Sequence, residues 1–510
     1  MQPTLVFQGQ TVAAAPFEQR WRQSASALQA SGVRQGDVVA LMLRNCPEAV
    51  ELMLAVRHLG AQWCPINWHF KADEVRHILQ DSGASVFIAD AALLAGLAEG
   101  LPAGLLDSAA GPGTGALRAF ACRGTVPGLS LPSWEAQRDR ASPIGPATAA
   151  PRGAMFYTSG TTGRPKGIVR AATTPEQLQR ALEVRRMSYG FDGSRGDMRA
   201  LLSAPLYHSA PNGYALGAAQ DSATLYLEER FDAERTLQLI HEHRLTHAYL
   251  VPTMFVRLLA LPQHVRANYD LGSMRFVAST GSPCPPQVKR EMIEWWGPVI
   301  HECYGASELG YMTLLTSEQA LRKPGSAGLP LPGVALAILD EAGRPVPAGQ
   351  AGLIYIDQPA FPDFSYIGNP EARERMAVGR LKTMGDIGFI DEDGFLFIVD
   401  RQADMVISGG VNIYPVEIEA VLHAMPGVAD CAVFGIPDDE FGESLAAAVQ
   451  PLPGATLTAE AVRSYVQQRM AGYKVPKVVT LHEALPREDT GKIFKRRLRE
   501  PYWEGRARRV

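Results

Sequence analysis

The sequence of 510 residues lacks the features of several protein classes. No uninterrupted apolar stretch reaches the roughly 20 residues of a membrane-spanning helix, and no basic segment followed by an apolar run opens the chain. The six cysteines are scattered, without the spacing of a metal site or a disulfide framework. The net charge of only −4 disfavours wholesale nucleic-acid binding. We therefore expect a cytoplasmic protein with reduced, mostly buried cysteines and no nucleic-acid partner.

Apolar periodicity predicts an α/β fold, and the length predicts at least two domains. Helical and strand patterns alternate over the first 330 residues, which is typical of βαβ units on parallel sheets. Helices are expected over 17–28, 47–59 and 234–243, and strands over 37–43, 85–88, 200–203, 247–251 and 275–278. Small residues over 103–116 predict an exposed loop.

From Val334 onward the pattern changes to short apolar segments separated by glycine and proline turns. Strands are expected over 334–339, 353–356 and 395–399. These segments predict a smaller β subdomain that follows the layered sheets.

The segment 157–167 reads Tyr-Thr-Ser-Gly-Thr-Thr-Gly-Arg-Pro-Lys-Gly and combines hydroxyls, glycines and one lysine. Glycines let backbone N–H groups approach an anion, and Lys166 supplies a point charge, so the segment suits phosphate binding. Its spacing differs from that of a P-loop. A buried strand over 154–157 and extended structure at 168–169 predict a strand-to-strand turn. A polar surface loop without function is the alternative for this segment alone.

Further motifs follow in order, and together they resemble the adenylate-forming superfamily of acyl-CoA synthetases, firefly luciferase and peptide-synthetase adenylation domains. The resemblance covers nearly the whole chain and is closest in character to stand-alone acyl-CoA ligases. It implies a large N-terminal AMP-binding domain over 1–401 and a small mobile α/β domain over 402–510 that closes the active site. The motifs are Gly-Ser-Pro at 281–283, Tyr-Gly-Ala-Ser-Glu at 304–308, Gly-Asp at 385–386, Asp-Arg at 400–401, Ser-Gly-Gly at 408–410 and Thr-Gly-Lys at 490–492.

The resemblance also implies which residues bind ATP and magnesium. Glu308 would bind Mg²⁺, because a hard cation that bridges phosphates needs a carboxylate, and the hydroxyl of Ser307 would contact the α-phosphate. Asp386 and Arg401 would hold the ribose hydroxyls. The remaining nucleotide ligands would be Thr158, Ser159, Gly160, Thr161, Thr162, Gly163 and Lys166 at the phosphates, and Gly281, Ser282, Pro283, Tyr304, Gly305 and Ala306 around the adenine.

Five further residues concern the two steps of the reaction. Lys492 would stabilise the charge that builds when the acid attacks ATP. His208 would gate and orient the acid, although a histidine after an apolar run can equally be a core residue. After rotation of the small domain, Gly409 and Gly410 would face the pantetheine of coenzyme A. The hinge residue of the family is commonly Asp or Lys, whereas this chain has Ala403.

The sequence thus predicts an ATP- and Mg²⁺-dependent ligase that activates an acid as its acyl-adenylate and transfers it to coenzyme A. The expected acid pocket carries no obvious lysine or arginine, so we expect a monocarboxylate of the fatty, aryl or steroid type. The alternatives are transfer of the acyl group to a carrier protein and a catalytically silent nucleotide-binding scaffold. The sequence leaves open whether the protein forms a homodimer. The expected pocket comprises residues 207–214, 251–254, 279–282 and 304–312.

Overall fold

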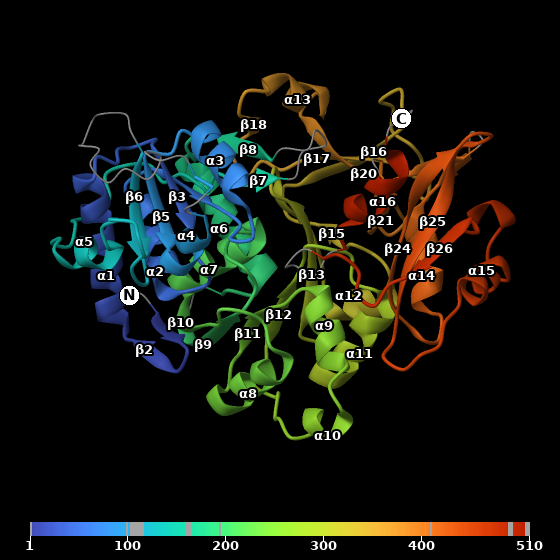
Figure 1. Ribbon diagram of the computed structural model, residues 1–510, viewed down its shortest axis with the longest axis horizontal. Coiled ribbons are helices and arrows are strands. Elements are labelled where there is room, and N and C mark those ends of the chain that lie inside the picture. Colours follow the sequence, from blue (N-terminus) through green and yellow to red (C-terminus); the bar gives the residue numbers. More distant parts are fainter. Residues whose placement is uncertain are drawn as a thin grey trace.

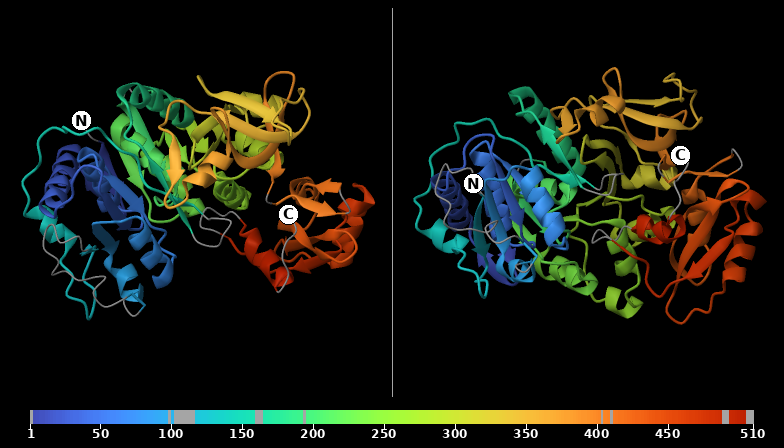
Figure 2. Two further views of the ribbon diagram at one scale, coloured as in Figure 1. Left: turned by 90° about the horizontal axis from the view of Figure 1, so that it is seen from above. Right: turned by 45° about the horizontal axis from the view of Figure 1, so that its top comes forward.

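A computed structural model describes residues 3–97, 100–101, 117–158, 165–192, 195–402, 404–408, 411–487 and 493–504. Layered α/β sheets form the larger part of the molecule, and the C-terminal segment forms a separate unit at one side (Figure 1). Figure 2 shows this unit, in orange and red, beside the layered body in two further views.

A nine-stranded sheet forms the centre of the larger part, and its strand order is β15-β14-β13-β12-β11-β9-β10-β1-β2. The strands from β13 to β1 are parallel, while β14, β15 and β2 are antiparallel additions at the edges. In this order the bounds are Leu329–Pro330, Gly310–Leu315, Ile300–Ala306, Phe276–Ser279, His247–Tyr249, Arg195–Leu202, Ser222–Leu227, Thr4–Phe7 and Gln10–Val12.

A second, fully parallel sheet has the order β4-β3-β5-β6, with bounds Gln62–Pro65, Val38–Met42, Val86–Asp90 and Arg118–Cys122. Helix α2 (Pro47–His58) joins both sheets, because its apolar residues belong to one core with the strands β3 and β9. Helices α3 (Ala72–Asp81) and α4 (Ala91–Leu97) pack on the other face. The predicted helices and strands of this region are confirmed.

Helices connect the parallel strands, as βαβ units require. Gly190 ends α6 in the left-handed conformation (φ 72°), and the ring of Phe276 lies too close for any side chain there. The other helices of the layered part are α1 (Ala14–Ala30), α5 (Trp134–Asp139), α6 (Pro175–Tyr189), α7 (Ser209–Asp221), α8 (Ala233–His243), α9 (Pro252–Leu259), α10 (Gln263–Arg266), α11 (Pro286–Trp296) and α12 (Ser317–Arg322).

The predicted β subdomain is an antiparallel sheet of β16 (Ala335–Leu339), β17 (Gly352–Asp357), β20 (Leu381–Ile390) and β19 (Ala377–Val378), with β21 (Leu396–Arg401) on β20. A smaller sheet, β18 (Phe364–Tyr366), β8 (Lys166–Arg170) and β7 (Tyr157–Thr158), shares its core, and α13 (Pro370–Arg375) follows β18. Because Thr158 pairs with Lys166, the predicted strand-to-strand connection is confirmed. The expected strand over 154–157 is wrong in extent, since 154–156 have no ladder partner in the described residues.

The C-terminal unit has its own apolar core around Val406, Ile418, Leu445 and Val462. Its sheet has the order β23 (Val411–Ile413), β22 (Val406–Ser408), β25 (Gly442–Pro451) and β24 (Val428–Asp438), and β26 (Val478–Leu481) lies parallel to β25. Its helices are α14 (Pro415–His423), α15 (Ala459–Gln467), the short 3₁₀ helix η1 (Gly472–Lys474) and α16 (Lys495–Trp503). The boundary at 401/402 stays a prediction.

Candidate active site

Three of the predicted site residues lie at the carboxyl edge of the parallel strands of the nine-stranded sheet. His208 follows β9, Gly281 follows β12, and Tyr304 lies near the end of β13. Strands β12 and β13 are parallel neighbours, with Ser279 opposite Glu302. Ligands of open α/β sheets bind at this edge, because loops from adjacent strands meet there.

The carboxylate of Glu308 joins this edge to the β7–β8 hairpin. Its Oε1 atom accepts a hydrogen bond from Thr158 Oγ1 at 3.3 Å and another from the hydroxyl of Tyr366 at 3.1 Å. Burial, followed by the charge of Glu308, raises the pKa of Tyr366, so the hydroxyl stays a donor. Lys166 Nζ lies 5.8 Å from the centre of the Tyr366 ring. Predicted phosphate and magnesium ligands therefore share one corner.

That corner fits a magnesium ion that arrives with ATP. Among the described residues, Glu308 Oε2 accepts no hydrogen bond, so it is available to a cation. The described part of the chain contains no group of three or more acidic, histidine or cysteine ligands for a metal. One carboxylate completed by phosphate oxygens and water is the arrangement that Mg²⁺ commonly adopts with nucleotides.

Arg170 fixes the backbone of the same segment. Its guanidinium donates to the carbonyl oxygen of Ser307 at 2.7 Å and also to that of Glu308. Burial lowers the pKa of Arg170 to about 10, so the group stays charged at neutral pH. The two carbonyl oxygens are thereby fixed, which restrains the backbone that carries the side chains of Ser307 and Glu308.

Ser307 and His208 meet through the start of helix α7. The hydroxyls of Ser307 and Ser209 lie 2.8 Å apart, and His208 is the residue that caps α7. The His208 ring packs on Tyr207 with centroids 4.3 Å apart, and Tyr207 packs on Trp68 at 4.6 Å. The predicted gating histidine thus lies next to a hydroxyl pair that bridges two strand ends.

The predicted ribose ligands form a second cluster around Asp386. Its carboxylate accepts from the Tyr304 hydroxyl at 2.5 Å and from Arg401 Nε at 3.2 Å. Burial and then the charge of Asp386 raise the pKa of Tyr304. Burial lowers the pKa of Arg401, but the charges of Asp386 and Asp404 outweigh it and raise the pKa overall. Asp386 is buried, whereas the Arg401 side chain is 57% exposed and can reach a ligand.

Glycines allow close approach at this edge. Gly281 has a φ of 98°, which suits glycine, and precedes Ser282 and Pro283 in the turn after β12. Gly305 lies opposite Tyr311 in the β13–β14 hairpin, and a Cβ atom there would be 2.7 Å from the carbonyl oxygen of Gly310. Ala306 continues the strand.

Other predicted site residues lie outside the described part of the chain. They are Ser159, Gly160, Thr161, Thr162, Gly163, Gly409, Gly410 and Lys492, together with the hinge residue Ala403.

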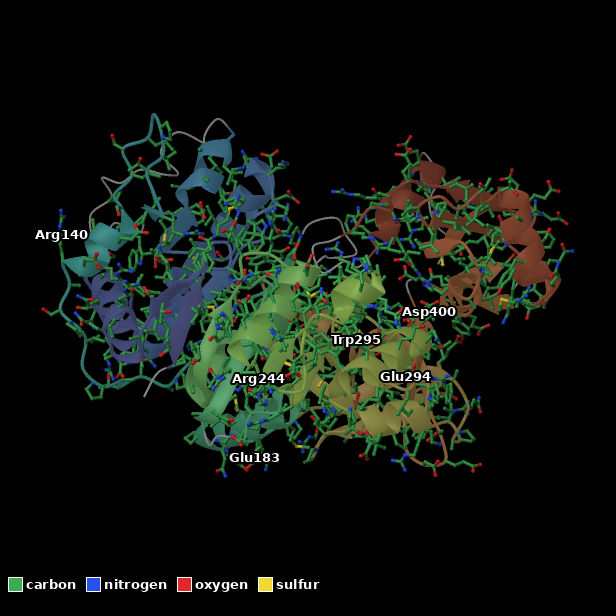
Figure 3. The ribbon with its side chains drawn as sticks, turned by 90° about the horizontal axis from the view of Figure 1, so that it is seen from below. Arg140, Glu183, Arg244, Glu294, Trp295 and Asp400 are labelled. Carbon is green, nitrogen blue, oxygen red and sulfur yellow. The ribbon has the colours of Figure 1, made fainter. Side chains whose placement is uncertain are left out.

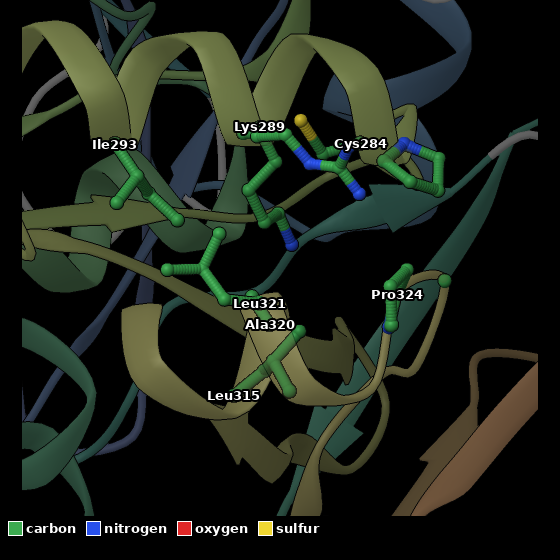
Figure 4. A pocket seen from close by; sticks show the side chains of 10 residues that line it. Cys284, Lys289, Ile293, Leu315, Ala320, Leu321 and Pro324 are labelled. Carbon is green, nitrogen blue, oxygen red and sulfur yellow. The ribbon is translucent and has the colours of Figure 1, made fainter.

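The cysteines are free and buried, as predicted. Cys284 lines a hollow of about 10 Å³ between α11 and α12, which is too small for a substrate (Figure 4). Burial raises the pKa of the Cys284 thiol to about 11, and that of Cys303 to about 12. Neither thiol is activated at neutral pH.

Two residues of the site, Tyr366 and Arg170, were not predicted from the sequence, whereas Ser209 lies within the expected pocket over 207–214. Tyr366 gave no signal at all. Arg170 offered one: it is a charged residue at the end of an apolar strand, four positions after Lys166. A buried arginine needs carbonyl or carboxylate partners, so such a position indicates a structural contact.

The chain is similar to known proteins over nearly its whole length. Residues 2–361 match the family described as AMP-binding enzyme, and residues 417–492 match the AMP-binding enzyme C-terminal domain. The chain is 33% identical to a feruloyl-CoA synthase of an Amycolatopsis species, over 97% of this chain and 94% of that protein. It is 31% identical to the fatty acid–[acyl-carrier-protein] ligase ScoC of Streptomyces coeruleorubidus, over 100% and 95%.

Among solved structures, ATP-bound MatB from Rhodopseudomonas palustris superposes with a TM-score of 0.83 at 28% identity, over 98% of this chain and 96% of that one. The apo form of MatB gives 0.72 at the same identity and coverage. This chain therefore superposes more closely on the ATP-bound form than on the apo form. Within the described residues, none of the helices combines the length and apolar character needed to cross a bilayer.

Proposed function

Because this chain belongs to the AMP-binding enzyme family and is an adenylate-forming acyl ligase that binds ATP, we propose that it activates a monocarboxylic acid as its acyl-adenylate and transfers the acyl group to coenzyme A. The observation that supports the proposal most is the meeting of Glu308, Thr158 and Tyr366 at one corner of the strand edge. Asp386 and Arg401 lie at the other cluster, joined to that edge by Tyr304.

In the first step, an oxygen of the acid attacks the α-phosphorus of ATP, and pyrophosphate leaves with the electron pair of the broken bond. Lys166 and Glu308, with its cation, would hold the leaving phosphates, and Ser307 would contact the α-phosphate. The protein's contribution is positioning and charge stabilisation, since a carboxylate nucleophile needs no base.

In the second step, the thiol sulfur attacks the acyl carbon, and AMP leaves. The described cysteines near the site have raised pKa values, so the sulfur would be that of coenzyme A. Feruloyl-CoA synthase is a CoA ligase by name and ScoC is an acyl-carrier-protein ligase. A carrier protein is therefore the second candidate acceptor.

The proposal is tested by measuring pyrophosphate release over a panel of carboxylic acids, and then thioester formation with the best acid. We expect pyrophosphate release to require ATP and Mg²⁺, and coenzyme A to be consumed in equal amount. Thioester formation only on an acyl carrier protein would favour the second acceptor. Failure of every acid to release pyrophosphate would contradict the proposed activity.

A further inference from the structure

Beside the Ser307 hydroxyl, a continuous set of contacts joins helix α7 to the β13–β14 hairpin. Ser209 lies 2.8 Å from Ser307, hydroxyl to hydroxyl. The hydroxyl of Tyr311 donates to that of Tyr189 at 3.1 Å, and the hydroxyl of Tyr189 donates to the carbonyl oxygen of Ala210 at 3.0 Å. Because Ala210 directly follows Ser209, these hydrogen bonds join the start of α7 to the hairpin by two routes, one through Ser307 and one through Tyr189 and Tyr311.

On the hairpin, these contacts lie beside the predicted nucleotide site. Tyr311 faces Gly305, and its Cδ1 atom lies 3.0 Å from where a Cβ on Gly305 would be. Gly305 is two residues before Ser307, so the Tyr311 ring starts beside the point where the acid and the α-phosphate would meet.

A second layer of rings lies behind the first. The ring of Tyr214, on α7, has its centroid 5.1 Å from that of Tyr189, 5.2 Å from Phe191 and 5.7 Å from Tyr249. Tyr214 is 0% exposed, and each of the other three is at most 2% exposed. The Tyr214 side chain is therefore closed to water molecules on every side.

Two glycines of α7 remove any gap between the helix and these rings. A Cβ on Gly213 would lie 2.8 Å from the Tyr189 hydroxyl, and one on Gly217 would lie 2.6 Å from the Phe191 ring. The rings consequently rest directly on the helix backbone. A close-packed interior yields to an inserted chain only by displacing whole side chains.

We propose that these five rings, Tyr189, Phe191, Tyr214, Tyr249 and Tyr311, form an aromatic wall that limits the size of the acid. The substrate is then a compact monocarboxylic acid, no larger than a short-chain or single-ring acid. This inference rests on the adenylation proposed above and narrows it, because long-chain fatty acids and steroid acids would have to displace the wall.

The unmodified protein provides the first test, in a pyrophosphate-release assay with hexanoate, benzoate, palmitate and cholate. We expect kcat/KM for hexanoate or benzoate to exceed that for palmitate and cholate by about tenfold or more. A preference for palmitate or cholate would overturn the aromatic wall while leaving the ligase activity established. No release with any acid would contradict the ligase activity itself, and the inference with it.

Tyr214→Ser provides the second test, because it removes a ring from the wall. Its kcat/KM for decanoate relative to hexanoate is expected to rise about tenfold, whereas Tyr269→Ser, which loses a tyrosine hydrogen-bonded to Glu234, keeps the profile of the unmodified protein. An unchanged profile in folded Tyr214→Ser would overturn the proposal. If that variant does not fold, Tyr214→Leu keeps apolar contact and answers the same question.

Discussion

Asp386 and Arg401 lie opposite each other on β20 and β21, and Arg401 Nε donates to Asp386 Oδ1 at 3.2 Å. The antiparallel ladder thus places a buried acceptor beside an exposed cation, although 15 residues separate them. Tyr304 reaches the same carboxylate from the nine-stranded sheet. One carboxylate therefore ties two sheets together at the predicted ribose site.

Asp386→Asn is expected to raise KM for ATP by roughly 10- to 100-fold, because a hydrogen bond to a charged group contributes about 1.5–3 kcal/mol. Steady-state kinetics with varied ATP provide the measurement. Asp391→Asn is the matched control, since Asp391 directly follows β20, the strand that contains Asp386, but pairs with Lys323 outside the site. Equal effects of the two substitutions would contradict the assignment of Asp386.

Glu308→Gln is expected to raise the Mg²⁺ concentration needed for half-maximal pyrophosphate release by about tenfold or more. Glutamine retains an oxygen that can accept from Thr158 and Tyr366 but loses the charge that attracts the cation. The measurement is a Mg²⁺ titration at saturating ATP. Tyr366→Phe, which removes one donor and no charge, serves as the control, and an unchanged titration in Glu308→Gln would refute the role.

Lys492→Ala is expected to abolish formation of the acyl-adenylate while largely retaining thioester formation from adenylate that is supplied ready-made. The charge is needed only while the acid attacks ATP. Both half-reactions are measured separately. Lys477→Ala, at a half-exposed lysine paired with Asp438, should change neither. Equal loss in both half-reactions of Lys492→Ala would exclude this role.

Asp400 provides a pH-dependent prediction. It lies where the chain enters the C-terminal unit (Figure 3) and accepts from the backbone N–H groups of Arg401 and Val416. Burial raises its pKa from 3.8 to about 6. The folded state therefore binds more protons than the unfolded state between these values, so this group's contribution to stability decreases as pH rises through that window.

Asp400→Asn should lack this dependence. The difference in the free energy of unfolding, variant minus unmodified protein, is expected to rise by about 2–3 kcal/mol between pH 4 and pH 6. A loss from the changed hydrogen bonds would shift this difference equally at every pH. Amide hydrogen exchange of the segment around Val416, followed against pH, measures it. A difference that is constant across the window would show that Asp400 ionises with an ordinary pKa.

Gly305→Ala is expected to lower the melting temperature and activity together, because the added methyl would lie 2.7 Å from the Gly310 carbonyl oxygen. A cost of about 1–3 kcal/mol is typical of such overpacking. Gly96→Ala, in α4 with nothing within 4 Å, should be neutral or slightly stabilising. Calorimetry of both variants checks the comparison, and full stability of Gly305→Ala would contradict the packing.

Much of the layered fold could be predicted, because α2 and strands such as β3 and β9 carry strong periodic or continuous apolar patterns. The buried strand expected over 154–157 was overextended, since the apolar run gives no sign of where ladder partners end. At the site, motifs identified Glu308 and Asp386, whereas Tyr366 as the donor to Glu308 could not be foreseen. That contact depends on how β18 pairs with β8, which is a long-range relationship.

Helix α2 has a consequence for how the molecule can move. Its residues from Ala49 to Val56 are all buried, and they contribute to the core between the four-stranded and the nine-stranded sheet. Sliding one sheet past the other would expose this helix, so we expect the two sheets to keep their relative positions throughout a catalytic cycle. The amide protons of α2 should accordingly be among the last to exchange with solvent, whatever rearrangement the C-terminal unit undergoes.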